Sequence, residues 1–458
     1  MRGAVTLFGQ RPEQDTHHSK ADSHTEDSAD SREKTELGIE HIAREDIEHR
    51  VIEAATGNHG HSGGHIIFLS FKFYYILYEK YHKNGESMIK AGILSMQRIY
   101  NYGSFLQAYG LKEILKELGC DVEFVDYHPG ECLIKADGGT GIKRKLAKVS
   151  ETFRYNAKLE DKLKFIKYKK NYAKNNYPYL GIDDTMNYNP QLDVLVIGSD
   201  EVFNCVQNNT NVGFAPELFG VGNNAKKLIT YAASCGNTTY EKLEKYKVKD
   251  KVSKWLKAFD CISVRDKNTG EIVSKLTGKD CVYNLDPVLA YDYIGKCDKI
   301  KKKVPDKNYI ILYGYSGRFS KEECKRIRKY ADKKGLKIYC IGGIQNCCDK
   351  FIDCSPFDVI SYFMNSNAVV TDTFHGTILS VITHRKFVSL VRKSGYGNSQ
   401  KLIDLLMRLK LKDRVANNIN DIETILSHDI DYSCTDKIIK EERNNTYEYL
   451  KNAIRIGE

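Results

Sequence analysis

Short apolar runs alternate with helix-like segments along most of this chain, and this order limits the folds it can adopt. The clearest unit begins at Met88, where an apolar run at 89–96 comes before a segment with helical spacing of apolar residues at 101–119. A second apolar run follows at 120–127. A strand, a helix and a strand in this order predict two parallel strands, because the helix carries the chain back to the same end of the sheet. We therefore predict an α/β fold with parallel sheets.

The αβ pattern occurs in two blocks, which the charged stretch KCDKIKKKVPD at 296–306 separates. In the second block, Ser355 and Pro356 suit the cap and the first position of a helix. Two αβ domains joined by a linker predict a two-lobed protein whose cleft lies at the carboxyl ends of the strands. The predicted boundaries are 1–87 for an N-terminal extension, 88–295 for the first domain, 296–410 for the second domain and 411–458 for a helical tail.

The first 65 residues differ from the rest in composition. They contain eight of the 13 histidines, many acidic residues and almost no apolar periodicity, which is typical of disordered chain. The apolar run at 65–82 contains Lys72 and is shorter than the roughly 20 residues that a membrane-spanning helix needs. We expect residues 1–87 to be a disordered upstream extension that takes no part in the function, and we predict no transmembrane segment.

Charge and cysteine content exclude some classes of partner. Lys and Arg exceed Asp and Glu by 70 to 60, and the net charge of +10 suits an anionic ligand as well as plain solubility. No RNP, zinc-finger or helix-turn-helix pattern is present, so we predict no nucleic-acid partner. The 13 cysteines include no C-x2-C pair, so we expect reduced thiols in a cytoplasmic protein and no metal site.

Polar residues follow four of the predicted strands, at the edge where parallel sheets bind ligands. In TDTFHGT, 371–377, His375 lies where a strand passes into a helix, and the open N–H groups of a helix start attract anions. Arg265 follows another strand, and its planar guanidinium suits a carboxylate or a phosphate. The other two segments are GSDE at 198–201 and Asp286-Pro287.

Each of these residues also has a structural interpretation. His375 could cap a helix or lie in the core, and Arg265 could pair with its neighbour Asp266. The carboxylates of Asp200 and Asp266 could cap the helices that follow them. Asp286-Pro287 could be a plain turn or part of a site. The segment NYGS at 101–104 could be a helix cap or a backbone nest that faces a ligand.

Five segments together carry a family resemblance, and they occur in the order NYGSFLQAYGL, VLVIGSDEVFN, ISVRD, LDPVL and VVTDTFHGTILSVI. The chain resembles the polysaccharide pyruvyl transferase family from Met88 to about residue 410. It differs from many relatives at Glu201 and Phe203, where they have glutamine and tryptophan. These two differences bear on which acceptor sugar the protein would prefer. The resemblance implies two Rossmann-like domains in a GT-B-like arrangement.

The resemblance also implies an enzyme that transfers a pyruvyl group from phosphoenolpyruvate to a sugar of a bacterial cell-surface polysaccharide, as a ketal. Such a reaction needs a proton for the methylene carbon of the donor, and histidine suits this acid. No cofactor and no metal is expected, since phosphoenolpyruvate is a substrate. The implied partners are phosphoenolpyruvate and a polysaccharide or lipid-linked glycan. The implied location is the cytoplasm, at the inner membrane face, with at most a peripheral membrane association.

Residue roles follow from the matching motifs. His375 is the expected acid or phosphate contact, and Asp200 is the expected proton acceptor for the sugar hydroxyl. Arg265 is expected to bind the donor, and Asp286 to be structural. The remaining expected substrate contacts are Asn101, Gly103, Gly198, Ser199, Asp266, Thr373, Gly376, Thr377 and one of the two lysines after the histidine motif, Lys386 or Lys393.

Other functions fit the same segments. A GT-B glycosyltransferase would use a strand-end histidine or arginine to bind the diphosphate of a nucleotide sugar. A catalytically silent αβ protein would bind a glycan or a partner enzyme with the same fold. A redox role is a more remote alternative, because its cysteines would need iron or a flavin.

Overall fold

A computed structural model describes residues 88–134, 149–392 and 399–455. The predicted disorder of residues 1–87 and the candidate Lys393 lie outside the described residues. No helix within the described ranges has both the length and the apolar character needed to cross a membrane.

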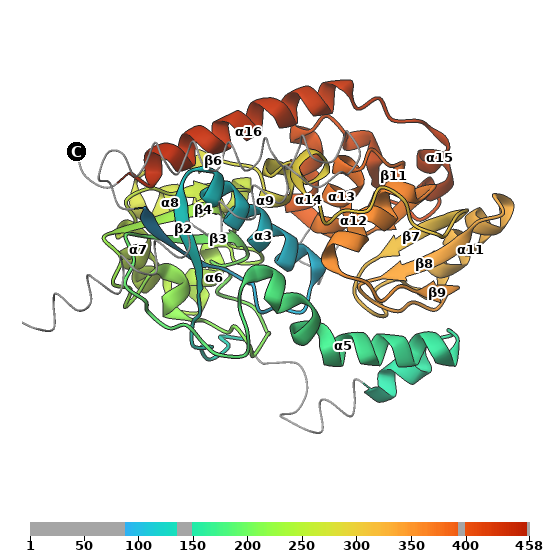
Figure 1. Ribbon diagram of the computed structural model, residues 1–458, viewed down its shortest axis with the longest axis horizontal. Coiled ribbons are helices and arrows are strands. Elements are labelled where there is room, and N and C mark those ends of the chain that lie inside the picture. Colours follow the sequence, from blue (N-terminus) through green and yellow to red (C-terminus); the bar gives the residue numbers. More distant parts are fainter. Residues whose placement is uncertain (1–87, 135–148, 393–398, 456–458) are drawn as a thin grey trace, which may run out of the picture. The chain divides into compact units, whose positions relative to one another are not determined.

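The first sheet contains six parallel strands in the order β2-β1-β3-β4-β5-β6 (Figure 1). Its central strand β3 has the sequence VLVIGSD and is buried along almost its whole length, as expected of a strand with helices on both faces. The strands are β1 (Ile89–Leu94), β2 (Cys120–Val125), β3 (Val194–Asp200), β4 (Lys227–Ala233), β5 (Ser263–Val264) and β6 (Val282–Tyr283).

The second sheet also contains six parallel strands, in the order β12-β11-β10-β7-β8-β9. The strands are β7 (Tyr309–Tyr313), β8 (Lys337–Ile341), β9 (Lys350–Phe351), β10 (Ala368–Thr371), β11 (Phe387–Leu390) and β12 (Val415–Ala416). The two parallel sheets, each with its helices, confirm the predicted α/β fold with two Rossmann-like units.

Local capping explains where many helices begin. Ser355 accepts a hydrogen bond from Asp358 N and Pro356 is the first helical residue, which confirms the predicted start of α12. The helices of the first half are α3 (Tyr102–Glu117), α5 (Leu159–Leu180), α6 (Tyr240–Lys245), α7 (Lys249–Lys257), α8 (Lys267–Thr277), α9 (Pro287–Ala290), α10 (Tyr293–Lys296) and the short 3₁₀ helix Pro216–Phe219. Those of the second half are α11 (Lys321–Lys333), α12 (Pro356–Asn365), α13 (Phe374–Ile382), α14 (Ser399–Arg408), α15 (Asp421–Ser427), α16 (Ser433–Ala453) and the 3₁₀ helix Lys412–Arg414.

Strand order reverses direction once in each sheet. In the first sheet the chain leaves β1 toward β2 on one side, and later returns to β3 on the other. In the second sheet the same reversal lies between β7 and β10. Loops diverge at such points and leave a crevice at the carboxyl ends of the strands, where α/β proteins bind ligands. The fold therefore places candidate sites after β1, β3, β7 and β10.

Helices α5 and α16 each contact the sheet of the other half of the chain. Their positions in the sequence do not predict these contacts. Helix α5 precedes β3, yet the carboxylate of Asp161 accepts a hydrogen bond from the backbone N of Phe351 in β9. Helix α16 follows the second sheet, yet Tyr449 Oη donates to the carbonyl of Thr230 in β4 at 2.8 Å. The domain boundaries near residues 295 and 410 stay predictions.

Candidate active site

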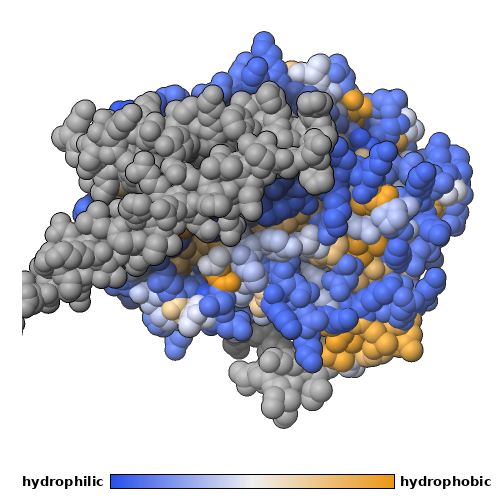
Figure 2. Space-filling view, in the orientation of Figure 1, coloured by the Kyte–Doolittle hydropathy of each residue, from blue (hydrophilic) through white to orange (hydrophobic). Residues whose placement is uncertain are grey.

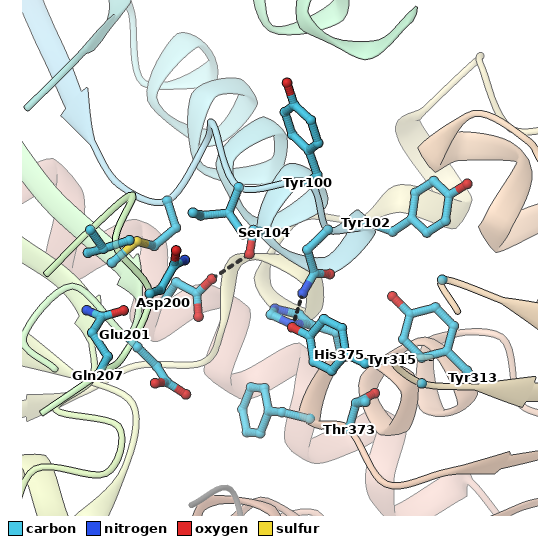
Figure 3. Close-up of a pocket in the computed structure, with 18 of the residues that line it drawn as sticks. Tyr100, Tyr102, Ser104, Asp200, Glu201, Gln207, Tyr313, Tyr315, Thr373 and His375 are labelled. Atoms are coloured by element: carbon cyan, nitrogen blue, oxygen red, sulfur yellow. Dashed lines mark hydrogen bonds between the residues drawn. The ribbon is translucent and has the colours of Figure 1, made fainter. Parts of the chain in front are cut away.

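A pocket opens where the loops after β1, β3, β7 and β10 meet. The first sheet contributes residues after β1 and β3, and the second sheet contributes residues after β7 and β10. Figure 3 shows Asp200 and Glu201 on one side, Tyr313 and Tyr315 on the other, and His375 between them. The reversal points of both sheets therefore share one pocket. Its polar lining includes Tyr100, Asn101, Ser104, Asp200, Glu201, Arg265, Tyr315, Thr373, His375 and Lys401.

His375 lies in the first turn of α13, two residues after the cap residue Thr373. Its side chain is 10% exposed, and its Nε2 lies 3.5 Å from Oδ2 of Asp286. Nε2 makes no hydrogen bond, although it is buried. On the opposite side of the ring, Gly103 packs so closely that a Cβ atom there would overlap Cγ and Nδ1 of His375. The imidazole is thus held between a carboxylate of the first lobe and the backbone of α3.

Substituting Gly103 with alanine tests this contact. In general, alanine stabilises a helix by about 1 kcal/mol relative to glycine. Here, however, the added methyl group would overlap Cβ, Cγ and Nδ1 of His375, so the histidine side chain would have to move. We expect Gly103→Ala to destabilise the protein by about 1–3 kcal/mol, as overpacking does. Denaturant unfolding measures this loss. In a His375→Gly background the same substitution should cost much less, because the ring and the Cβ atom that it would overlap are both gone; an equal cost in both backgrounds would show that another contact is responsible.

Arg265 joins two carboxylates beneath the pocket. Its Nη2 donates to Oδ1 of Asp200 at 3.0 Å, and its Nη1 donates to Oδ2 of Asp286 at 2.5 Å. The side chains of Arg265 and Asp286 are 2% and 0% exposed, so both pairs are desolvated. The guanidinium also lies over the ring of Phe374 at 4.7 Å. Only Nε of Arg265 is left without a hydrogen-bond partner. Of the five N–H groups of the guanidinium, the one on Nε, which is buried, and one of the two on Nη2 make no hydrogen bond, and the predicted contact of Arg265 with the donor depends on these.

The pKa of Asp200 bears on its predicted role as a proton acceptor. Burial alone would raise that pKa, but the charge of Arg265, followed by that of His375, outweighs burial and lowers the pKa to about 2. Ser104 Oγ also donates to Oδ2 of Asp200 at 2.8 Å. A carboxylate with this pKa is a weak base at neutral pH. The role of Asp200 as proton acceptor stays a prediction.

Asp286, which the sequence indicated only as a structural residue, contacts two residues of the site. Burial would raise its pKa, but His375 and then Arg265 lower it below the usual value. Asp286 also caps α9, since its Oδ1 accepts from Val288 N at 3.0 Å. It is structural, as expected, and it also faces the imidazole.

The other predicted contacts divide into lining residues and supporting residues. Asn101 and Thr373 line the pocket as the caps of α3 and α13, and Asn101 Nδ2 also donates to Tyr315 Oη at 2.6 Å. Gly198 does not line the pocket; it adopts φ 125° against Tyr231. Residues that support neighbouring elements, without lining the pocket, are Ser199, whose Oγ donates to Ala232 O, Gly376, which packs on Thr371 and Tyr313, and Thr377, whose hydroxyl bonds to that of Ser389.

Two residues that were predicted to contact the substrate do not line the pocket. Asp266 is the cap of α8 and accepts hydrogen bonds from Thr269 N and Ser234 Oγ, the structural interpretation that the sequence left open. Lys386 pairs with Asp429 at 2.6 Å and lines a separate depression, so it does not reach this pocket.

The sequence did not predict one ion pair between the two lobes. Lys401 Nζ, from α14, lies 2.6 Å from Oε1 of Glu201, which follows β3, and the lysine side chain is 4% exposed. Glu201 is adjacent to Asp200, but nothing in the sequence near Lys401 marks it as a site residue. Because Arg265 and Lys401, the lysine and arginine side chains among the described lining residues, already face carboxylates, an added anion must rely on other groups as well.

Two helix starts supply such groups. Helices α3 and α13 both begin at the pocket, with lining residues in their first turns. The first N–H groups of a helix have no acceptor inside the helix, and its dipole favours negative charge there. In the described ranges, no three His, Cys, Asp or Glu side chains are grouped to hold a metal ion. The pocket suits a small polar anion, and the expected absence of metal stays a prediction.

Solved structures resemble the chain only weakly. A putative UDP-N-acetylglucosamine 2-epimerase from Listeria monocytogenes is 12% identical, with a TM-score of 0.40, over 81% of this chain and 98% of that one. The S. aureus MnaA–UDP structure is 11% identical, with a TM-score of 0.37, over 79% and 97%. A mutant O-GlcNAc transferase from Thermobaculum terrenum is 12% identical, with a TM-score of 0.35, over 80% of this chain and 64% of that one. These likenesses support no function, because identities and TM-scores are low.

A search of curated proteins finds no match in sequence. The sequence profile of polysaccharide pyruvyl transferases, however, matches residues 101–394, a range that holds Asp200, Arg265 and His375. The match covers well over half of the chain, and the chain belongs to the polysaccharide pyruvyl transferase family, a family of transferases.

Proposed function

We propose that this protein transfers a pyruvyl group from phosphoenolpyruvate to two hydroxyls of one sugar in a polysaccharide or lipid-linked glycan, in the cytoplasm. One observation carries the proposal: His375, whose buried Nε2 faces the carboxylate of Asp286, lies in the pocket that both reversal points form in a member of this family. The reaction needs a positioned proton donor near neutral pH, and histidine is the side chain that titrates there.

The reaction begins with proton transfer. His375 gives a proton to the methylene carbon of phosphoenolpyruvate, and positive charge develops at C2. The first sugar hydroxyl attacks C2 and its proton passes to the imidazole, which restores the acid. The C2–phosphate bond then breaks, the second hydroxyl closes the ketal, and its proton leaves with phosphate. The carboxylates of Asp200 and Asp286, both ionised, stabilise the positive charge at C2 and on the imidazole.

The donor anion is held by the helix starts. The first-turn N–H groups of α13 and α3 that the caps leave open bind its phosphate and carboxylate oxygens, assisted by an N–H group of Arg265 and the hydroxyl of Thr373. Asp286 orients the imidazole from the Nε2 side, and Gly103 packs against the Nδ1 side. Both contacts preorganise the acid before the donor binds.

A thermal melt of the full chain distinguishes this function from its rivals. A ligand at about a hundred times its dissociation constant stabilises the native state by roughly 2.7 kcal/mol. We expect phosphoenolpyruvate to raise the melting temperature, and a panel of UDP-sugars to leave it unchanged. The Thr373→Val variant should lose part of the shift, since it lacks the hydroxyl, which also caps α13.

The matched control is Lys386→Ala, which removes a cation outside the pocket and should keep the full shift. Stabilisation by a nucleotide sugar alone would favour a glycosyltransferase. If neither ligand shifts the melt, the silent glycan-binding alternative gains support.

A further inference from the structure

A patch of exposed apolar side chains lies outside the pocket, on residues 149–154, which are helical, and on the start of α5. Figure 2 shows an apolar area at the lower right, where Figure 1 places α5. The exposed fractions are large for apolar side chains: 40% for Val149, 44% for Phe153, 62% for Leu159 and 52% for Leu163. Such a cluster is a marker of an interaction surface.

Helix α5 has two distinct faces. Its buried face packs against β9 and α3, and its members recur at helical spacing: Asp161, Phe165, Tyr168, Tyr172 and Asn176. The opposite stripe is exposed along its length, and its members also recur at helical spacing: Leu159, Leu163, Lys167, Lys170 and Lys174. One exposed stripe thus changes from leucine at its start to lysine further along.

Charge on this surface is mainly positive. Arg154 and Lys158 are exposed beside the apolar residues. The exposed Glu160 pairs with Lys164 of the same helix at 2.5 Å. Among the described residues, Lys167, Lys170 and Lys174 form no ion pair. The excess of basic groups is therefore available to an anionic partner.

We propose that this α5 surface, which comprises Val149, Phe153, Leu159, Leu163, Lys167, Lys170 and Lys174, binds the surface of an anionic lipid bilayer. Leucine and phenylalanine side chains enter the boundary between headgroups and acyl chains, and lysines along the same stripe meet the anionic headgroups. A soluble polyanion would account for the lysines, but it would leave the four apolar side chains in water. The combination of both kinds of side chain on one stripe fits a membrane surface better.

The position of α5 links this surface to the pocket. Tyr168, on the buried face of the same helix, lines the pocket. A helix with its side chains is about 10 Å across, so a bilayer bound to the exposed stripe lies about one helix diameter from Tyr168. An acceptor attached to a lipid would reach the pocket without leaving the membrane surface. The membrane proposal rests on the α5 surface alone and does not require pyruvyl transfer.

Vesicle sedimentation with the full chain tests the proposal. We expect binding to phosphatidylcholine vesicles that contain ~30% phosphatidylglycerol, weak binding to phosphatidylcholine alone, and release at ~0.5 M salt. Reversing two charges, in Lys167→Glu/Lys170→Glu, should lower the partition coefficient by at least roughly tenfold. Leu159→Ser/Leu163→Ser should lower it by a similar factor through loss of inserted apolar area.

Matched controls lie elsewhere on the surface. Met407→Ser removes a side chain that is 51% exposed on α14, and Lys325→Glu reverses a charge on a side chain that is 77% exposed on α11. Both should bind vesicles like the parent. All variants should keep the melting temperature of the parent, since none of the changed side chains is buried.

Equal binding to neutral and anionic vesicles, or parental binding by both α5 variants, would overturn the proposal. Sedimentation needs no phosphoenolpyruvate, so its outcome is separate from that of the ligand melts. Binding to vesicles without stabilisation by phosphoenolpyruvate would refute the proposed reaction and leave the α5 surface supported.

Discussion

Replacing His375 with alanine should lower pyruvyl transfer by roughly 10²–10⁴-fold, the range that a positioned acid supplies. The ring makes no hydrogen bond through Nε2, so its loss leaves no donor or acceptor without a partner. Asp286 keeps Arg265 as its partner in the variant. We therefore expect the free energy of unfolding to fall by only about 1 kcal/mol, the usual size for a single substitution. Phosphate release from phosphoenolpyruvate in the presence of acceptor measures the activity.

His384→Ala is the matched control for this result. His384 lies in the same lobe, is half exposed, stacks on Tyr432 and bonds to Asp436, all away from the pocket. Its removal should leave turnover unchanged. His375→Gln keeps a polar side chain of similar reach but cannot serve as the acid, so it should be as inactive as the alanine variant. Parental turnover in either His375 variant would remove this residue from the mechanism.

Replacing Arg265 with alanine should destabilise the protein by about 3–5 kcal/mol, the usual cost of breaking a buried ion pair. The substitution leaves Asp200 and Asp286 beneath the pocket without the cation that neutralises them. Equilibrium unfolding in denaturant measures the loss. Arg326→Ala, on the exposed face of α11 beside Glu322 at 3.7 Å, is the control and should change stability by at most about 0.5 kcal/mol.

The pH dependence of the Arg265→Ala variant gives a second readout. In the parent, the pKa of Asp200 is about 2 and that of Asp286 is lowered. Their stabilisation is therefore complete above the unfolded pKa, near ~4, and is lost as the pH falls toward the folded values. In the variant, burial is no longer opposed by Arg265, so both pKa values rise. Protonation then relieves the buried charge, and the difference in stability from the parent should narrow as the pH falls from neutral.

A constant difference at all pH values would show that Arg265 stabilises the fold by packing, for example on Phe374, and not by charge. Arg265→Lys separates charge from geometry, because a lysine cannot donate to both carboxylates in the planar fork of a guanidinium. It should keep part of the stability and weaken the binding of phosphoenolpyruvate.

Local sequence patterns predicted the parts of this structure that depend on neighbouring residues. Apolar runs became buried parallel strands, because strand burial follows from composition over a few residues. Ser355 and Pro356 start α12 as expected, because a cap acts on backbone groups within one turn. The strand-end positions of Asp200, Arg265 and His375 also follow from local pattern, since polar residues after an apolar strand lie at the edge of the sheet. All three line one pocket.

Contacts between residues far apart in the chain depended on the tertiary structure. Asp286 faces His375, and Lys401 pairs with Glu201, across separations of about 90 and 200 residues, and no local pattern encodes either contact. Strand order and the crossing of helices between lobes decide which loop ends meet. The same reason explains why Lys386, nine residues after the histidine motif, points elsewhere.

The sequence by itself therefore determined the two parallel αβ units, their helix caps and the family, because each depends on short segments in a fixed order. Only the tertiary structure decided which carboxylates neutralise Arg265, which groups hold the imidazole of His375, and that one stripe of α5 stays exposed. Those outcomes depend on how sheets and helices pack in three dimensions, and the first two join side chains that the sequence keeps tens to hundreds of residues apart.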